Sequence, residues 1–283
     1  MSGINVNRTT ISLPTELSSK ILSKVQEGSA VMSLAQSMAL PGLGATIPVI
    51  TGDPEAAWVA ETGKKPVSRP GLSTKVMQPY TLAVIVPFSN QFKNDVPALY
   101  NAIVERLPKA LAQKFDSTVF HGTAPGSNFD TFASCTAQAF GSNPYSALVA
   151  ADADIAAHNG ILDGFVLAPQ AKSKLLSAVD GNQRPLFINN VAEGAIPMIL
   201  GSKTYQSKAA YKDDTTDVIG IAGDWSQAIY GIAQNLSISI SDQATLDDNG
   251  TQINLWQQNM FAVRAEIEVG FVADTDCFNL LTE

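Results

Sequence analysis

The sequence predicts an α+β protein with two lobes. Apolar residues recur at every fourth position from Leu99 to Val119, which is the spacing of one face of an α-helix. From Phe261 to Phe271 apolar residues alternate with charged ones, which is the pattern of a half-buried strand. Short helical and short strand patterns follow one another between these two segments, so we expect a second lobe inserted between the long helix and the last strand.

Composition bounds the class of protein. The chain has 283 residues, 45% of them hydrophobic, which is enough for a substantial core. Its formal net charge is -8, whereas sequence-independent DNA binding needs clustered Lys and Arg, so such binding is not expected. Two cysteines, Cys135 and Cys277, exclude a disulfide scaffold and are expected to be reduced thiols. The sequence shows neither a signal peptide nor an apolar run of about 20 residues, so we expect cytoplasmic synthesis and no membrane partner.

The first third of the chain is predicted to be mostly extended and to project from the folded body. A polar arm is expected over 1–12, a short amphipathic helix over 13–28 and an extended Gly- and Pro-rich segment over 41–54. Between Trp58 and Phe88, two candidate strands flank a polar loop, and the second, TLAVIVPF, is rich in β-branched residues. A two-stranded ribbon is marginally stable alone in water, so a projecting ribbon needs a surface to lie on.

A long helix follows the ribbon. Asn94 or Asp95 is suited to cap it, Pro97 fits its first turn and Gly122 ends it. At 1.5 Å per residue such a helix is about 40 Å long. Pro108 lies in its middle and removes one backbone hydrogen bond, so we expect a bend or two stacked helices there.

The remaining region mixes both element types. Helical patterns cover 145–159 and 169–179, and strand patterns cover GFVLAP, IPMIL, VIGIAG, AIYGIA and LSISISD. The run Asp247–Gly250 reads as a hairpin turn. The alternating strand from Phe261 closes the fold.

The sequence does not indicate a catalytic site. His121 and His158 are the two histidines and are expected to be structural, because a metal site needs three or four clustered ligands. The serine-hydrolase elbow G-x-S-x-G is absent, and GSKT at 201–204 departs from the phosphate-binding G-K-[ST] order. We therefore expect no cofactor, no metal and no catalytic residues. Long, reaching elements without a catalytic constellation are typical of an assembly subunit with large interfaces.

Motif order points to a family. A W-x-x-E motif at Trp58 and Glu61 opens the loop, Ser89 and Asp95 bound the turn before the helix, and Gly122 ends the helix. Further matching segments are GFVLAP, DGNQRPLF, GDWSQAIYGI and RAEIEVGF. In this order and spacing, nearly the whole chain resembles the major capsid proteins of tailed bacteriophages, which have the Hong Kong ninety-seven-like fold.

The resemblance implies a domain plan. It assigns an N-terminal arm to 1–54, an extended β-hairpin loop to 55–90, a peripheral lobe with the spine helix to 91–139, an axial lobe to 140–250 and a returning peripheral strand to 251–283. The loop would lie across an adjacent subunit, with contacts from Trp58, Glu61, Lys64, Lys65 and Arg69. Its excess of positive charge would favour docking on an acidic shell. A merely solvated loop is the other interpretation of these charges.

Some members of this family weld their shells with Lys–Asn isopeptide bonds. The resemblance places Lys75, Asn259 and Glu266 where that trio would stand. A lysine amine is nucleophilic only when deprotonated, so it needs a desolvated pocket and a nearby base. Asn259 and Glu266 are seven residues apart, on opposite faces of a regular strand, so separate chains would have to supply them. We favour a shell without this cross-link.

The implied function is self-assembly, as hexamers and pentamers, into an icosahedral head shell of the virion, built in the host cytoplasm. The shell would enclose double-stranded DNA without reading its sequence. A separate scaffold protein, a portal, and protease or decoration proteins are the other implied partners. Two alternatives stay open: an encapsulin-type nanocompartment shell that packages an enzyme, and a soluble α/β enzyme with an unrecognised site.

Overall fold

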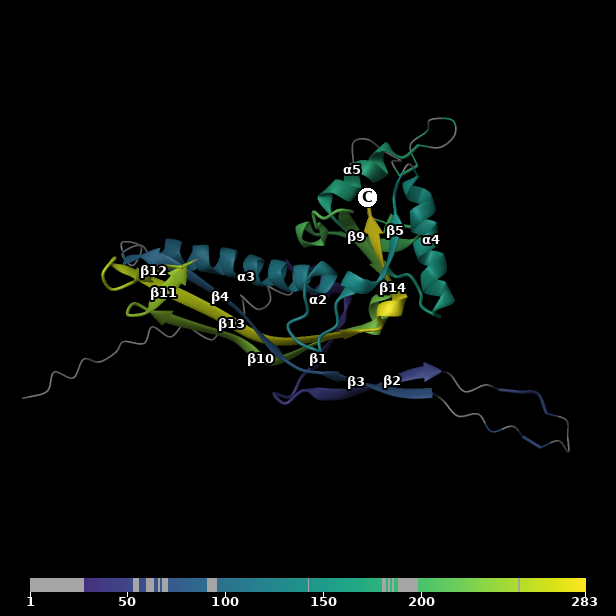
Figure 1. Ribbon diagram of the computed structural model, residues 1–283, viewed down its shortest axis with the longest axis horizontal. Coiled ribbons are helices and arrows are strands. Elements are labelled where there is room, and N and C mark those ends of the chain that lie inside the picture. Colours follow the sequence, from purple (N-terminus) through teal and green to yellow (C-terminus); the bar gives the residue numbers. More distant parts are fainter. Residues whose placement is uncertain are drawn as a thin grey trace, which may run out of the picture.

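The computed structural model describes residues 28–52, 56–59, 64–65, 67, 71–90, 96–141, 143–179, 182, 184, 186–187, 198–248 and 250–283. Two sheets, one long helix and a projecting hairpin organise these residues (Figure 1). The arm expected over 1–12 and all but the last residue of the helix expected over 13–28 lie outside the described residues. Within the described part of the chain, no helix combines the length and apolarity that a bilayer crossing requires.

The long helix is α3, Val96–His121, and it runs along a four-stranded sheet (Figure 1). In sheet order the strands are β1 (Gln36–Ala39), β10 (Ala228–Ser241), β13 (Met260–Ala273) and β4 (Tyr80–Ser89). The helix is continuous through Pro108, so the prediction of two stacked helices is wrong. Leu107, Leu111 and Phe115 are buried in one core with the sheet, and this shared packing keeps the segment as one helix.

Alternation along β13 is confirmed. Val263, Ala265 and Ile267 are buried, whereas Arg264 is exposed. The two strands expected from AIYGIA and LSISISD are instead one strand, β10, with register shifts between Ile232 and Gln234 and between Gln234 and Ser237. Bulges of this kind absorb extra residues without ending a strand, so the interrupted pattern did not mark a break.

The second sheet has six strands and carries two helices. In sheet order these strands are β5 (Thr136–Ala139), β14 (Phe278–Thr282), β9 (Val218–Gly223), β6 (Gly164–Leu167), β8 (Ser202–Gln206) and β7 (Met198–Ile199). The predicted helices are confirmed as α4, Pro144–Ala157, and α5, Pro169–Ser177. Every residue of β6 and β9 is buried, as continuous apolar runs predict.

Two strands pair in a different sheet from the other strands of the unit to which the domain plan assigns them. The expected unit 140–250 includes β10, yet β10 pairs with β13 beside the long helix. The expected unit 251–283 includes β14, yet β14 lies between β5 and β9 in the six-stranded sheet. The chain therefore passes between the two sheets three times, after β4, after β9 and after β13. The first crossing includes α3, and the other two are short 3₁₀ turns, Trp225–Gln227 and Thr275–Cys277.

An aromatic cluster fills the junction between the sheets. The Phe132 and Phe278 rings stack with centroids 4.2 Å apart, and the Trp225 ring meets Phe278 edge-on at 5.3 Å. Trp225 is fully buried, and its Nε1 donates a hydrogen bond to the Gly164 carbonyl at 3.2 Å. A Cβ on Gly223 would overlap the Phe278 ring, so this position needs glycine. The relative placement of the two sheets thus depends on close packing.

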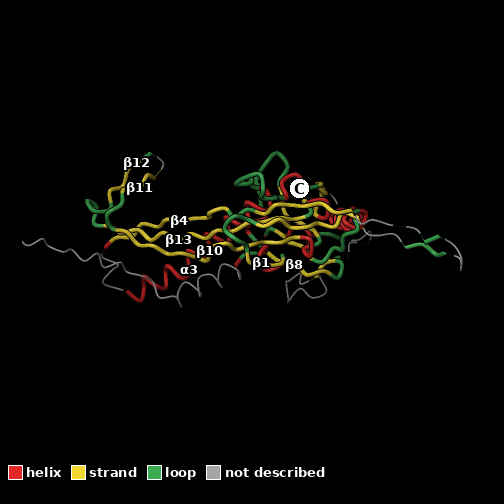
Figure 2. The backbone as a smooth tube through the Cα atoms, turned by 90° about the horizontal axis from the view of Figure 1, so that it is seen from below, coloured by secondary structure: helices red, strands yellow, loops and turns green. Residues whose placement is uncertain are grey.

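The projecting hairpin consists of β2 (Ala45–Gly52) and β3 (Gly71–Met77), which pair antiparallel and lead away from both sheets (Figure 1). The described parts of the loop that joins them lie clear of the body at the right of both views (Figures 1 and 2). This corrects the expected strand pair. The segment assigned to the arm supplies β2, and TLAVIVPF forms β4 of the four-stranded sheet instead of the hairpin. The alternating burial of β4 explains the correction, because one of its faces is committed to the core.

A second, smaller hairpin is confirmed at the predicted turn. Strands β11 (Thr245–Asp248) and β12 (Thr251–Asn254) pair antiparallel. Gly250 has φ +87, and its N–H donates to Asp247 Oδ1 at 2.7 Å. A left-handed glycine in this place is what such a turn requires.

Candidate assembly interface

The loop between β2 and β3 exposes side chains that are usually buried. Trp58 is as exposed as an isolated residue, at 105%, and Val67 is 85% exposed. Lys64 and Lys65 are also exposed, whereas Glu61 and Arg69 lie outside the described residues. An exposed indole on a projecting loop is suited to anchor an interface, because tryptophan is enriched at binding hot spots.

The root of the hairpin, in contrast, is firmly packed. Met77 is fully buried against Gly231 and Gly270, which face each other across β10 and β13. A Cβ on Gly231 would come within 2.8 Å of Met77 Sδ, and one on Gly270 within 2.8 Å of Met77 Cγ. The glycine pair therefore forms a socket for the Met77 side chain, and Leu40 packs in the same small core.

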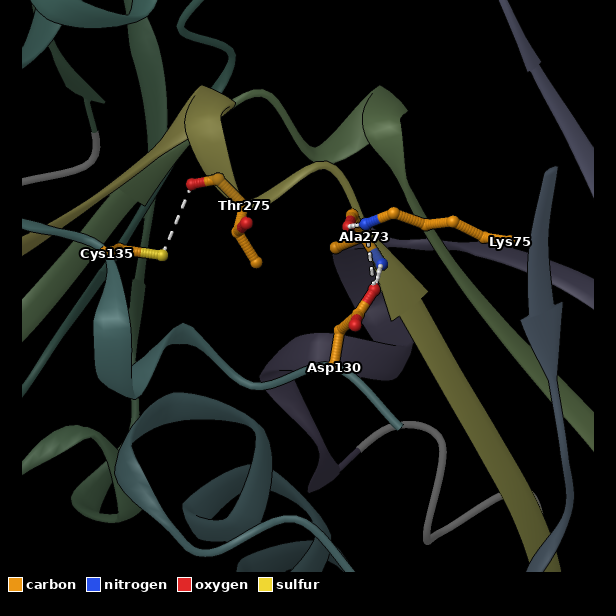
Figure 3. Close-up of polar contacts among 5 residues, drawn as sticks. All are labelled: Lys75, Asp130, Cys135, Ala273 and Thr275. Carbon is orange, nitrogen blue, oxygen red and sulfur yellow. Dashed lines mark hydrogen bonds and ion pairs between the residues drawn. The ribbon is translucent and has the colours of Figure 1, made fainter. Parts of the chain in front are cut away.

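A polar contact lies beside this socket (Figure 3). Lys75 Nζ donates to Asp130 Oδ2 at 3.1 Å and to the Ala273 carbonyl at 2.6 Å. The same Asp130 oxygen accepts the Ala273 N–H at 3.1 Å. Lys75 and Asp130 are 37% and 29% exposed, so the ion pair is partly open to solvent. It joins the hairpin to the end of β13 and to the loop after α3.

One subunit does not bring Lys75, Asn259 and Glu266 together. Lys75 contacts the last residue of β13, Glu266 lies inside that strand, and Asn259 immediately precedes it. A strand of 14 residues spans about 45 Å, so the two ends are far apart. Asn259 Oδ1 accepts a hydrogen bond from Asn90 Nδ2 at 2.8 Å, and Glu266 Oε1 accepts one from Ser237 Oγ at 3.1 Å.

Histidines and cysteines have local, structural contacts. His121 Nε2 donates to the Ala209 carbonyl and His158 Nδ1 to the Asp154 carbonyl, both at 2.9 Å, which supports the predicted structural role. Both cysteines are free thiols. Burial raises the pKa of Cys135 to about 12 and that of Cys277 to about 11, so neither is a ready thiolate. No cluster of three metal-binding side chains occurs among the described residues.

A buried carboxylate fastens the segment before β1 to the long helix. Asp116 of α3 is 1% exposed and faces the N-terminus of the short helix α2, Ala30–Leu34. It accepts hydrogen bonds from Ser29 Oγ at 2.5 Å, from Ala30 N at 2.9 Å and from Val31 N at 3.4 Å. Burial raises the pKa of Asp116 from 3.8 to about 6, and the three hydrogen bonds oppose that rise.

The raised pKa of Asp116 predicts a stability change with pH. Between about pH 4 and about pH 6 the folded state holds a proton that the unfolded state has lost, so the free energy of unfolding falls as the pH rises. This group should remove up to about 3 kcal/mol between acid and neutral pH. Urea unfolding of the wild type and of Asp116→Asn across this range measures it.

The difference between the two proteins isolates this carboxylate from all others. We expect the wild type to lose stability relative to Asp116→Asn as the pH rises from about 4 to about 7. Parallel curves for the two proteins would show that Asp116 titrates normally.

A long helix on one sheet, a second sheet joined through an aromatic core and a projecting hairpin define the class of protein: this is the fold of phage capsid subunits. A solved structure from Microbacterium phage Oxtober96 has a TM-score of 0.72 at 21% identity and covers 90% of this chain and 91% of that chain. A structure titled "Capsid of empty GTA particle computed with C5 symmetry" has a TM-score of 0.66 at 14% identity, covering 90% and 89%. At these identities the likenesses establish the fold, and the predicted Hong Kong ninety-seven-like class is confirmed.

The sequence profile of the phage capsid family matches residues 10–280, and the chain belongs to that family. The probable major capsid protein gp17 of Mycobacterium phage D29 is 28% identical over 289 residues, covering 95% of this chain and 89% of that protein. Members of this family are structural proteins of the capsid, which locates them in the virion.

Proposed function

We propose that this chain is a major capsid protein that assembles as hexamers and pentamers into the icosahedral head shell of a phage. Family membership and fold support this role, and one observation carries it further. The β2–β3 hairpin projects from the body and exposes Trp58 and Val67. A ribbon of two strands is marginally stable in isolation. Burial of its exposed apolar side chains by a neighbouring copy would lower the free energy of the assembly.

The neighbour supplies electrostatic complementarity as well as apolar surface. Lys64 and Lys65 lie on the exposed loop, while the chain as a whole carries a net charge of -8. Opposite charge on loop and body steers encounter and penalises wrong orientations more than it adds affinity. The hairpin therefore lies across an adjacent subunit and helps to set register in the shell.

The other partners follow from the container role. The shell encloses double-stranded DNA without sequence-specific contacts, as the acidic balance of the chain favours. A separate scaffold protein or none, a portal, and protease or decoration proteins complete the expected set. Each subunit acts as a building unit and carries out no catalysis.

Light scattering and negative-stain electron microscopy of the purified full-length chain test this function. We expect concentration-dependent assembly into ring-shaped capsomers and closed shells. A chain that stays monomeric at every concentration, alone and with its scaffold, would overturn the proposal.

We further predict that the shell holds without the Lys75–Asn259 weld. The Lys75 ammonium is already bound by Asp130 and by the Ala273 carbonyl of its own chain, and a charged, hydrogen-bonded amine is a poor nucleophile. Shells boiled in detergent should give a single band near 29.9 kDa on a denaturing gel. A ladder of multimers that disappears in Lys75→Arg would show the cross-link to exist.

A further inference from the structure

We infer that Lys75 is a positioning residue: through Asp130 and the Ala273 carbonyl, it fixes the direction in which the β2–β3 hairpin leaves the body. The hairpin would then reach a neighbouring copy in an orientation already set within each subunit. Only this last consequence rests on the proposed shell function; the orientation itself is a property of the single chain.

The argument begins where β3 meets the body. Met77, the last residue of β3, is buried in the Gly231–Gly270 socket, and β4 begins three residues later at Tyr80. Ala45 and Ile47 of β2 pack against the same small core as Met77, so apolar contacts hold the root of the hairpin on both strands. Apolar contacts are non-directional, so a second, polar contact is needed to fix the angle at which the ribbon leaves the body.

Lys75 provides that second contact. Residues two apart in a strand point to the same face, so Lys75 and Met77 both face the body, whereas Val76 between them is 42% exposed. Lys75 Nζ reaches two acceptors there, the Asp130 carboxylate and the Ala273 carbonyl. The two contacts are about 7 Å apart along the strand and together define a direction.

The acceptor side of this contact is itself rigid. The Asp130 backbone N–H donates to the Phe271 carbonyl at 3.1 Å, and its side chain accepts from the Ala273 N–H. Two hydrogen bonds that do not involve Lys75 thus hold Asp130 against β13. Lys75 then joins β3 to the end of β13, the strand that runs through the centre of the four-stranded sheet.

This role differs from the one the family resemblance assigns to the same lysine. A nucleophile for an isopeptide bond must shed its proton and be free to meet an asparagine of another chain. The observed contact uses the charged ammonium, which has three N–H donors, and places it on two acceptors of its own chain. Lys75 is therefore an anchor for the hairpin.

Distances between spin labels test the inference. Labels at Val67→Cys on the loop and Gln113→Cys on the exposed side of α3, in a Cys135→Ser background, report the direction of the hairpin in unassembled subunits. Lys75→Met keeps the aliphatic stem but removes the charge, and Asp130→Asn removes the charge on the other side. We expect both variants to shift and broaden the distance distribution, while Lys75→Arg restores it and the neighbouring Thr74→Ala leaves it unchanged.

Two outcomes would overturn the inference. One is an unchanged distribution in Lys75→Met or in Asp130→Asn. The other is a change of equal size in Thr74→Ala, which would indicate general loosening. Unfolding midpoints close to the wild type in all variants separate orientation from stability.

High salt supplies a check that involves no substitution. Salt should broaden the wild-type distribution, because the ion pair is partly exposed, and should leave that of Lys75→Met unaffected. If salt changes the distance distribution of neither the wild type nor Lys75→Met, the Lys75–Asp130 ion pair does not orient the hairpin. Because these measurements use unassembled subunits, failure of the wild type to form shells would reject the proposed function and leave this inference intact.

Discussion

A chain in which residues 53–70 are replaced by Asn-Gly is expected to fold normally and to lose shell assembly. Gly52 and Gly71 face each other in the β2–β3 register, so a two-residue turn can close the hairpin there. The described core residues all lie outside the replaced segment. Thermal unfolding should therefore change little, whereas light scattering and electron microscopy should show free subunits or capsomers in place of closed shells.

A milder variant tests the same contact without shortening the chain. Trp58→Ser removes the exposed indole and should raise the concentration needed for assembly while leaving the unfolding midpoint unchanged. If the shortened chain still closed into shells of normal size, assembly would not depend on contact between the hairpin loop and an adjacent subunit.

Trp225→Ala is expected to cause the largest loss of stability among single substitutions. Trp225 is fully buried between the sheets, packs edge-on against Phe132 and Phe278, and donates to the Gly164 carbonyl. Truncating a buried aromatic leaves a cavity and costs about 3–5 kcal/mol. Urea unfolding of the full-length chain, at a concentration below that of assembly, measures the loss.

Trp256→Ala is the matched control for this prediction. Trp256 is 72% exposed, so its truncation should change the stability of the unassembled chain by about 0.5 kcal/mol or less. Equal midpoints for Trp225→Ala and the wild type would mean that the junction cluster does not hold the two sheets together.

Periodic elements could be predicted from the sequence because their signal is local. Apolar residues at every fourth position predicted the helix α3, and alternating apolar and polar residues from Phe261 predicted the strand β13. In both, the spacing of apolar side chains reflects the geometry of one element against one core. The order of motifs then predicted the capsid fold, which the family profile and the solved structures confirm.

Strand partners could not be predicted in the same way. The alternation in β4 says that one face is buried but does not say whether the partner is β3 or β13. The bulges in β10 hid the continuity of a single long strand. The position of β14 in the six-stranded sheet depends on a 3₁₀ turn, Thr275–Cys277, whose sequence carries no mark of a change of sheet.

The contacts at the root of the hairpin were also missed. Lys75 and Asp130 are 55 residues apart, and the Gly231–Gly270 socket exists only once the β10–β13 register is known. Asp116 did leave a signal. It stands four residues after Ala112 and four before Phe120, both buried, so a carboxylate on the buried face of α3 could have indicated an internal partner.

Electron cryo-microscopy of the assembled shell, at a resolution that shows side chains, tests most directly whether the hairpin is an intersubunit element. The β2–β3 hairpin of each subunit should extend onto an adjacent copy, with Trp58 covered by that copy and Lys75 still bound to Asp130 of its own chain. A hairpin folded back against its own sheets, with Trp58 buried inside the same subunit, would contradict the proposed assembly.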